Sequence, residues 1–295
     1  MPRKRIAKLL DRYRVTSGEG FKLKHYDPGD TAPDLVDHEE SEALLAHSIV
    51  ELARLQSQLY AQNRWAVLCV LQAMDTAGKD GTIKHVMTGV NPQGVDVTSF
   101  KAPSATELDH DFLWRNNAAL PKRGTIGIFN RSHYEEVLVA RVHPEIIERQ
   151  HLPKQRMGHK FWQHRMEDIA NFERYLDRQG IVTVKFFLRI SRDEQKRRLL
   201  ERLDDQAKHW KFDPNDMKER AHWDEYHTAF EEAIGATAAK HAPWYVVPAD
   251  HKWFAHLVVG EAIIHALKKL DLDLPPATPE REEQLAAARK QLEGE

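Results

Sequence analysis

The chain has 295 residues, with 43 Lys and Arg against 45 Asp and Glu, and a formal net charge of −2 at pH 7. This balance is unlike that of proteins that bind nucleic acid over a broad surface, so we expect no nucleic-acid partner. A single cysteine, Cys69, excludes an intramolecular disulfide and a cysteine-based zinc cluster, and it fits a reducing cytoplasm. No apolar run approaches the ~18 residues of a membrane span, so we expect a soluble protein with no membrane partner.

Strand-like and helical patterns alternate along the sequence. The basic, amphipathic start, residues 1–15, favours a surface helix over a transit peptide because it carries Asp11 and few serines. Apolar residues at helical spacing then predict a long helix from Asp37 or Ser41 to about Asn63. Strands are predicted at 65–71, 95–100, 124–129, 181–190 and 244–247, and helices at about 79–86, 106–119 and 161–176.

Five strands alternating with helices predict an α/β fold, a three-layer α/β/α domain with a mainly parallel five-stranded sheet. Its ligand crevice should lie at the carboxyl ends of the strands. Residues 192–240 are charged and rich in helix formers, which predicts a helical insertion that covers the crevice as a lid. We expect one domain over 1–270 and a helical tail over 271–295, in which Thr278 caps the helix and Pro279 takes its first position.

The loop MDTAGKDGT, residues 74–82, follows a buried strand and opens a helix, which is the setting of a phosphate-binding loop. Gly78 lets backbone amides face an anion, Lys79 supplies a point charge, and Thr82 or a neighbour caps the helix. The alternative is a plain strand-to-helix turn in which Asp75 is a capping residue. The phosphate-binding residues predicted from this loop are Ala77, Gly78, Lys79, Asp80, Gly81, Thr82 and Lys84.

This loop departs from the common nucleotide-binding pattern GxxxxGK[ST] at two positions. Ala73 stands where the first glycine belongs, and Asp80 follows Lys79 where Ser or Thr would contact magnesium. Asp75 is also unusual, because a carboxylate repels bound phosphates unless a divalent cation lies between them. We therefore predict that Asp75 contacts Mg²⁺, with Mn²⁺ as the alternative ion.

A second set of polar residues follows the strand at 124–129. Asn130 and Arg131 end that strand, and Arg131 should lie over the phosphate loop if the two strands are parallel. P-loop enzymes use an acidic residue here to support magnesium, whereas this chain has the neutral Asn130, with Glu135 and Glu136 a helical turn later. We predict nucleotide binding by Asn130, Arg131, Glu135 and Glu136.

Basic residues are concentrated in two segments. Residues 115–165 carry ten Lys and Arg against four Asp and Glu, and residues 185–211 carry nine against five. Such clusters fit an extended anion. The candidate lid arginines, at or after a strand end, are Arg189, Arg192, Arg197, Arg198 and Arg202, of which Arg189 and Arg192 are predicted to bind phosphate. Solvated helix faces carry similar charges, so the prediction concerns the cluster rather than each residue. The 17 histidines form no tight metal-ligand spacing.

Several motifs in order resemble those of the polyphosphate kinase 2 family: MDTAGKDGT, FKAPSATELDHDFLWR, FNRSHYEEVLVARVHPE, FWQHRMEDIANFERYL, FFLRISRDEQKRRLLERL and APWYVVPADHKWFA. The resemblance covers roughly residues 20–270. It implies a thymidylate-kinase-like P-loop fold with a helical lid. It also implies Mg²⁺-dependent transfer of the terminal phosphoryl group of inorganic polyphosphate to a nucleotide.

By matching motif, the resemblance makes Asp75, Lys79 and Arg131 the catalytic residues, with Asp75 as metal ligand. Asn130 departs from the aspartate common in the family. The motif FNRSHYEE is similar to that of the family branch that phosphorylates AMP as well as ADP. Adenine nucleotides are therefore the expected partners, with guanine nucleotides as further acceptors. The resemblance also implies a homo-oligomer.

Two other functions compete with this interpretation. An ATP-using nucleoside monophosphate kinase would share the fold, although Ala73 and Asp80 argue against it. A nucleotide-gated regulatory protein would bind at the loop without turnover, and Asp75 beside the basic cluster favours chemistry over this. A transfer assay with defined phosphate donors separates the three.

Overall fold

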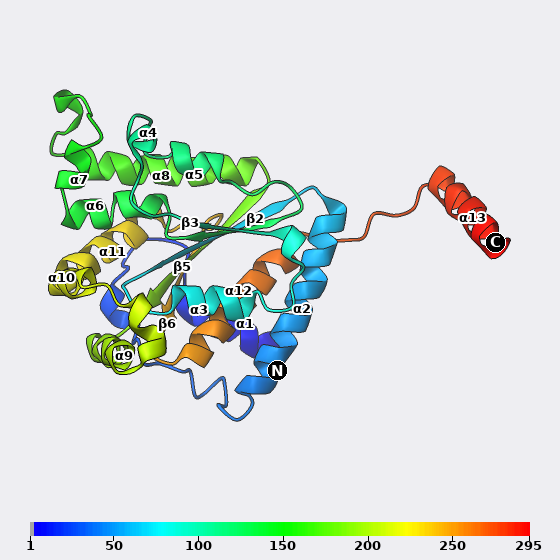
Figure 1. Ribbon diagram of the computed structural model, residues 1–295, viewed down its shortest axis with the longest axis horizontal. Coiled ribbons are helices and arrows are strands. Elements are labelled where there is room, and N and C mark those ends of the chain that lie inside the picture. Colours follow the sequence, from blue (N-terminus) through cyan, green and yellow to red (C-terminus); the bar gives the residue numbers. More distant parts are fainter. Residues whose placement is uncertain (1–2) are drawn as a thin grey trace.

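The computed structural model describes residues 3–295, in which a sheet lies between two layers of helices (Figure 1). The strands are β1 (Arg14–Val15), β2 (Ala66–Ala73), β3 (Val95–Ser99), β4 (Ile126–Asn130), β5 (Ile181–Arg189) and β6 (Trp244–Pro248). The helices are α1 (Arg3–Tyr13), α2 (Ser41–Gln62), α3 (Lys79–Val86), α4 (Ala105–Leu108), α5 (Trp114–Ala118), α6 (Val139–Val142), α7 (Glu145–Glu148), α8 (Phe161–Arg178), α9 (Arg192–Asp204), α10 (Asn215–Ala221), α11 (Trp223–Thr237), α12 (Lys252–Lys268) and α13 (Pro279–Glu293). Short 3₁₀ turns lie at Leu23–His25, Pro92–Gly94, His133–Glu136, Lys154–Arg156 and Gln206–Lys211.

The strand order is β1-β6-β5-β2-β4-β3, and every pairing except β1 with β6 is parallel. β2 is central, and its residues from Ala66 to Leu71 are all buried, as expected for a strand covered on both faces. After β2 the chain builds β3 and β4 on one side and then crosses to β5 on the other. The carboxyl end of β2 is therefore a switch point, where α/β sheets bind their ligands.

Helices cover both faces of this sheet (Figure 1). α8 packs on β5 and α11 packs on α8, whereas α12 packs on β5, β6 and β2, with α2 and α3 beside it. α1 completes the second layer through its buried Leu9, Leu10 and Tyr13, the last with its ring edge against Phe254 of α12. The predicted three-layer α/β/α architecture is confirmed. The predicted helix over 1–15 runs from Arg3, and residues 1 and 2 lie outside the described part of the chain.

Two predicted elements are wrong in detail. Among residues 3–295 the sheet has six strands rather than five, because the two residues of β1 pair antiparallel with Trp244 and Tyr245. The predicted helix over 106–119 is divided into α4 and α5, and Ser104 caps α4 through a capping box with Glu107. Neither difference moves the carboxyl ends of the central strands.

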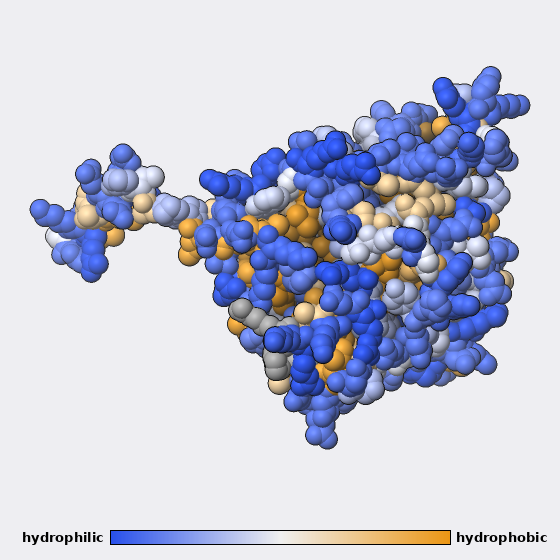
Figure 2. Space-filling view, turned by 180° about the vertical axis from the view of Figure 1, so that it is seen from behind, coloured by the Kyte–Doolittle hydropathy of each residue, from blue (hydrophilic) through white to orange (hydrophobic). Residues whose placement is uncertain are grey.

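The C-terminal segment stands apart from the rest of the molecule. Thr278 caps α13 by accepting a hydrogen bond from the Arg281 amide, and Pro279 takes the first turn, as predicted. Every residue of α13 is exposed. Figure 2 shows this segment clear of the body, with apolar residues gathered on the body near the point where it leaves. Within residues 3–295, no helix is both long and apolar enough to span a bilayer.

Candidate active site at the phosphate loop

The loop between β2 and α3 has the conformation of an anion-binding turn. Thr76 and Gly78 adopt left-handed backbone angles, with φ of 65° and 104°, and α3 begins directly afterwards at Lys79. The cap of α3 is Gly78, so the prediction that Thr82 or a neighbour caps this helix is wrong: Thr82 is buried inside α3. The amide groups of the first turn therefore point toward the end of β2.

Lys79 lies across this loop. Its ammonium donates to the carbonyl of Ala73 at 3.1 Å, which holds the side chain over the turn. Burial, and to a smaller extent the nearby Arg131, lower the pKa of Lys79 below its ordinary value. A bound phosphate would offset both effects, because it supplies a negative charge at the same place.

The parallel register brings Arg131 to the loop. Asn130 on β4 is paired with Leu71 on β2, and the Arg131 amide donates to the Leu71 carbonyl at 3.1 Å. Arg131 also has a left-handed backbone, with φ of 64°, which is a strained conformation for a non-glycine residue. With this backbone conformation, the guanidinium lies beside Asp75 of the loop.

Two carboxylates hold the Arg131 side chain. Its guanidinium lies 3.4 Å from the Asp75 carboxylate and 3.9 Å from that of Glu135, and Glu135 chiefly raises the pKa of Arg131. Gln72 on β2 in turn donates to Glu135 at 2.9 Å. Arg131 therefore stays charged and is aimed at the space between the loop and the opposite wall.

Asn130 makes a different contact from the one expected of an acidic residue at this position. Its side-chain amide donates to the Asp80 carboxylate at 2.6 Å. The two departures seen in the sequence, a neutral Asn130 and an acidic Asp80, therefore form one hydrogen-bonded pair. An aspartate at 130 would face Asp80 with a like charge.

A cavity of about 650 Å³ opens above the loop. Its floor includes the loop from Asp75 to Thr82, together with Asn130 and Arg131. The opposite wall comes from the 192–240 segment and α12 and is rich in cations, namely Arg198, Arg202, Lys208, Lys211 and Lys252. Eight Lys and Arg side chains thus line the cavity against three Asp and Glu, and this excess of positive charge suits a ligand with several phosphates.

A second cavity of about 240 Å³ lies next to the first, and Asp75 and Arg131 line both. It has an apolar part and an acidic part. The apolar residues are Met74, Leu138, Val139, Tyr226 and Phe230, and the acidic residues besides Asp75 are Glu135, Asp213, Asp216 and Glu219. Burial, followed by the charge of Asp75, raises the pKa of Asp216 to about 6.

Four residues predicted to bind ligand line neither of these cavities. Lys84 is exposed further along α3, and Arg192 is exposed at the start of α9. Arg189 at the end of β5 has a pKa lowered by burial, with Asp27 and Asp250 as its acidic neighbours. Glu136 is buried against the Arg165 guanidinium at 2.9 Å.

Two of the candidate lid arginines, Arg198 and Arg202, line the larger cavity, but sequence reasoning missed the lysines of its wall. Lys208 and Lys211 fall within the basic segment at 185–211, so a signal was present, but the segment alone did not show which side chains face the loop. Lys252 at the start of α12 had no such signal.

Arg198 connects α9, in the cationic wall of the larger cavity, to the phosphate loop that forms its floor. This buried guanidinium donates to the carbonyls of Thr76 and Ala77 at 3.1 and 3.0 Å, and to those of Ala249 and Asp250 at 2.6 and 3.0 Å. Its Nε donates to Glu194 at 2.6 Å, so all five N–H groups have acceptors. α9 is thereby attached to the phosphate loop itself.

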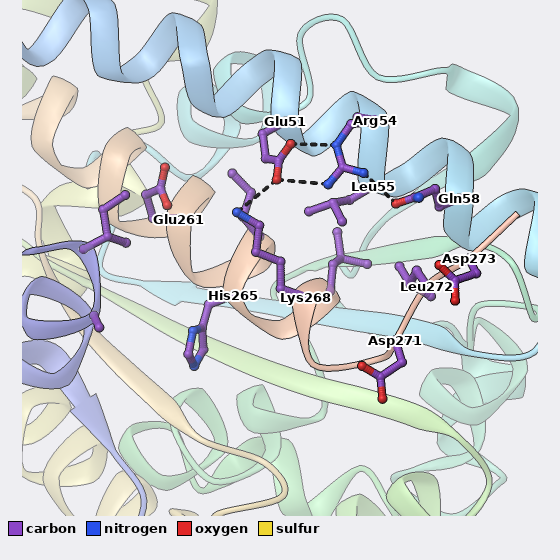
Figure 3. Close-up of a pocket in the computed structure, with 14 residues that line it drawn as sticks. Glu51, Arg54, Leu55, Gln58, Glu261, His265, Lys268, Asp271, Leu272 and Asp273 are labelled. Atoms are coloured by element: carbon purple, nitrogen blue, oxygen red, sulfur yellow. Dashed lines mark hydrogen bonds and ion pairs between the residues drawn. The ribbon is translucent and has the colours of Figure 1, made fainter. Parts of the chain in front are cut away.

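A third cavity, of about 600 Å³, lies between α1, α2 and α12, away from the phosphate loop (Figure 3). Arg54 and Lys268 on its wall both pair with Glu51, at 2.8 and 2.9 Å. Four carboxylates line this cavity against these two cations, namely Glu51, Glu261, Asp271 and Asp273. This lining is less suited to polyanions than that of the cavity above the loop, where Lys and Arg outnumber Asp and Glu.

The donor set of the site fits a divalent cation that binds together with phosphate. Within the described residues 3–295, no group of three or more His, Cys, Asp or Glu side chains is arranged to hold a metal ion. Asp75 nevertheless presents a partly exposed carboxylate to both cavities. Mg²⁺ commonly takes one or two carboxylates and completes its coordination with substrate phosphates and water.

A phosphate loop at the switch point, an arginine from the neighbouring strand and a cationic helical wall define a P-loop phosphotransferase. Comparisons with known proteins specify the class. A family model described as Polyphosphate kinase 2 (PPK2) matches residues 35–275.

Similar proteins cover almost the whole chain. ADP-polyphosphate phosphotransferase of Rhodopseudomonas palustris is 46% identical over 282 residues, which is 95% of this chain and 97% of the relative. AMP/ADP-polyphosphate phosphotransferase of Meiothermus ruber is 43% identical over 266 residues, with 90% and 96% covered. The crystal structure of Polyphosphate Kinase 2 from Arthrobacter aurescens TC1 has a TM-score of 0.85 and 41% identity over 96% of each chain. The chain belongs to the polyphosphate kinase 2 family.

Proposed function

We propose that this chain transfers the terminal phosphoryl group of inorganic polyphosphate to AMP and ADP. The observation that carries the proposal is the pair of adjoining cavities, which share Asp75 and Arg131 and differ in charge. The names of the Rhodopseudomonas and Meiothermus relatives, which specify ADP and AMP/ADP as partners of polyphosphate, support the same reaction.

The larger, cation-lined cavity suits the polyphosphate donor. Arg202, Lys208 and Lys211 face the loop across it, so a chain of phosphates meets positive charge on both sides. We assign this wall, the helical segment 192–240, the role of a lid. Arg198 would keep its base fixed, because it bonds both to the loop and to the 249–250 turn.

The smaller cavity suits the nucleotide acceptor. Its apolar side, with Tyr226 and Phe230, offers a surface for a base, and its carboxylates can accept hydrogen bonds from ribose hydroxyl or exocyclic amino groups. Arg131 at the boundary of the two cavities would receive the acceptor phosphate. Guanine carries an exocyclic amino group too, so we extend the proposal to guanine nucleotides.

The reaction needs placement and charge neutralisation rather than a general base. The acceptor phosphate is ionised near neutral pH, and its oxygen forms the new bond to phosphorus while the bond to the bridging oxygen of polyphosphate breaks. Lys79 and Arg131 would balance the charge on the transferred group and on the shortened polyphosphate. Bound Mg²⁺, with Mn²⁺ as the alternative, would be held by Asp75 and the phosphates and would shield the carboxylate from them.

Two broader features belong to the same proposal. A cytoplasmic setting is supported by Cys69, which is buried within β2 as a reduced thiol. A homo-oligomer is supported by the exposed α13, which presents Leu285 and Leu292 to solvent. Light scattering of the purified chain measures the oligomeric state directly.

The test is a coupled assay of the purified protein with AMP or ADP, Mg²⁺ and long-chain polyphosphate, beside reactions with ATP as the sole phosphate donor. Formation of ATP from both AMP and ADP only with polyphosphate supports the proposal. Product from AMP in the ATP reaction alone would show an ordinary nucleotide kinase. Nucleotide binding without turnover under every condition would show a regulatory protein.

A further inference from the structure

A buried polar cluster lies directly behind the Arg131 turn. It consists of Tyr134, Glu173, Lys185 and Thr237, each at most 2% exposed. These residues come from the 3₁₀ turn after β4, from α8, from β5 and from the last residue of α11. Four separate elements therefore meet at one point.

The cluster is tightly hydrogen-bonded. The Tyr134 hydroxyl lies 2.7 Å from the Glu173 carboxylate and 2.8 Å from the Thr237 hydroxyl. Lys185 uses all three of its N–H donors, to Glu173, to the Tyr134 hydroxyl at 3.1 Å and to the Thr237 carbonyl at 2.8 Å. Trp244 adds a hydrogen bond to the Thr237 hydroxyl at 2.9 Å.

Stability alone does not explain a buried Lys–Glu pair. Desolvation opposes the burial of both charges, and well-packed apolar side chains of similar volume usually serve a core as well or better. Such a network does, however, favour one geometry, because the ammonium, the carboxylate and both hydroxyl groups bond to one another. The elements that the network joins therefore indicate its role.

The elements at the two ends of the cluster also line the smaller cavity. Tyr134 follows Arg131 by three residues, and its amide donates to the Ser132 hydroxyl at 3.1 Å within the same turn. Thr237 ends α11, whose Tyr226 and Phe230 line that cavity. Lys185 on the central β5 connects the two ends.

We propose that Tyr134, Glu173, Lys185 and Thr237 are positioning residues that hold the strained Arg131 turn at a fixed place relative to α11. The proposal rests on the proposed function, since it assigns Arg131 to the phosphoryl group and α11 to the nucleotide. None of the four side chains lines the cavities, so they act through Arg131 and the wall rather than on substrate.

The primary test is Tyr134→Phe, which removes the hydroxyl that bridges the cluster and keeps the ring. Tyr175→Phe on α8 is the matched control, because Tyr175 is exposed. We expect kcat with ADP and polyphosphate to fall at least tenfold in Tyr134→Phe, with KM for polyphosphate within twofold of wild type. The control should keep both values.

A second variant separates positioning from stability. Glu173→Leu combined with Lys185→Met replaces the ion pair by apolar side chains, which a core of this kind tolerates. A melting temperature near that of wild type, with kcat reduced at least tenfold, supports the proposal. A kcat within twofold of wild type in the folded fraction of either variant overturns it.

A third measurement keeps the test independent of turnover. If wild type transfers no phosphoryl group, the proposed function fails, and calorimetric binding of ADP decides the positioning role. Weakening of ADP binding by at least tenfold in Tyr134→Phe then supports the proposal, and unchanged affinity overturns it. If Tyr134→Phe does not fold, the double variant alone decides the question by the same criteria.

Discussion

Arg198 offers a sharp test of how the cationic wall is attached to the phosphate loop. Its five N–H groups reach four backbone carbonyls and Glu194, and the side chain is 5% exposed. Arg198→Lys keeps the charge but leaves only three donors, so at least two of these five acceptors lose their partner.

Each buried acceptor left without a partner costs about 1–3 kcal/mol, so Arg198→Lys should lower the free energy of unfolding by about 2–6 kcal/mol. The neighbouring Arg197 is the control, because it is exposed and pairs only with Glu194 and Glu201 on its own helix. Arg197→Lys should change stability by less than about 0.5 kcal/mol.

Urea unfolding followed by circular dichroism measures both variants, and the transfer assay measures activity in the folded state. We expect Arg198→Lys to lose activity as well, because the carbonyls it holds belong to the phosphate loop. Equal stability of the two variants would refute the idea that this guanidinium joins α9 to the loop.

Three further predictions concern the loop, the smaller cavity and the tail. Gly78→Ala should destabilise the fold by about 1–3 kcal/mol, because φ is 104° at this position. Gly81→Ala in α3 should stabilise the fold by about 0.5–1 kcal/mol, because an added Cβ meets nothing within 4 Å there. Urea unfolding of both variants checks this, and equal effects on the free energy of unfolding would contradict it. Burial and the charge of Asp75 raise the pKa of Asp216 in the folded state to about 6, from an ordinary value of 3.8. The folded state therefore binds the Asp216 proton more tightly than the unfolded state, and the protein loses stability as pH rises from about 4 to 6. Asp216→Asn should remove this loss, on the order of 1–3 kcal/mol at pH 7, and unfolding curves at pH 4 and pH 7 that keep the wild-type difference would contradict the assignment. A chain that ends at Leu274 should still unfold cooperatively in a thermal scan, since every residue of α13 is exposed and the core of the domain does not depend on it, and loss of the cooperative transition would contradict this.

The central fold was predictable because its signals are local. A continuous apolar run marked β2, short strand-like segments marked β4 and β5, and the glycine and lysine of the loop marked the start of α3. Parallel pairing then placed Arg131 over the loop, as the sequence predicted, because adjacent parallel strands end at the same edge.

The remaining differences depend on tertiary packing. Glu135 and Glu136 are adjacent and chemically alike, yet one contacts Arg131 and the other is buried against Arg165, and no local pattern distinguishes them. Arg202 rather than Arg192 lines the larger cavity because the path of α9 over the loop decides which turn faces it. β1 is two residues long and carries no period that a sequence could show.

The most direct test of the account compares Lys79→Ala with Lys84→Ala in the formation of ATP from ADP and polyphosphate. Both lysines lie on α3, but Lys79 lines the larger cavity and Lys84 is exposed outside it. We predict that kcat falls by a factor on the order of 10²–10³ in Lys79→Ala, by analogy with other groups that stabilise charge in a transition state. Lys84→Ala should keep wild-type activity. Comparable activity of Lys79→Ala and wild type, with both folded by circular dichroism, would contradict the assignment of phosphoryl transfer to this loop.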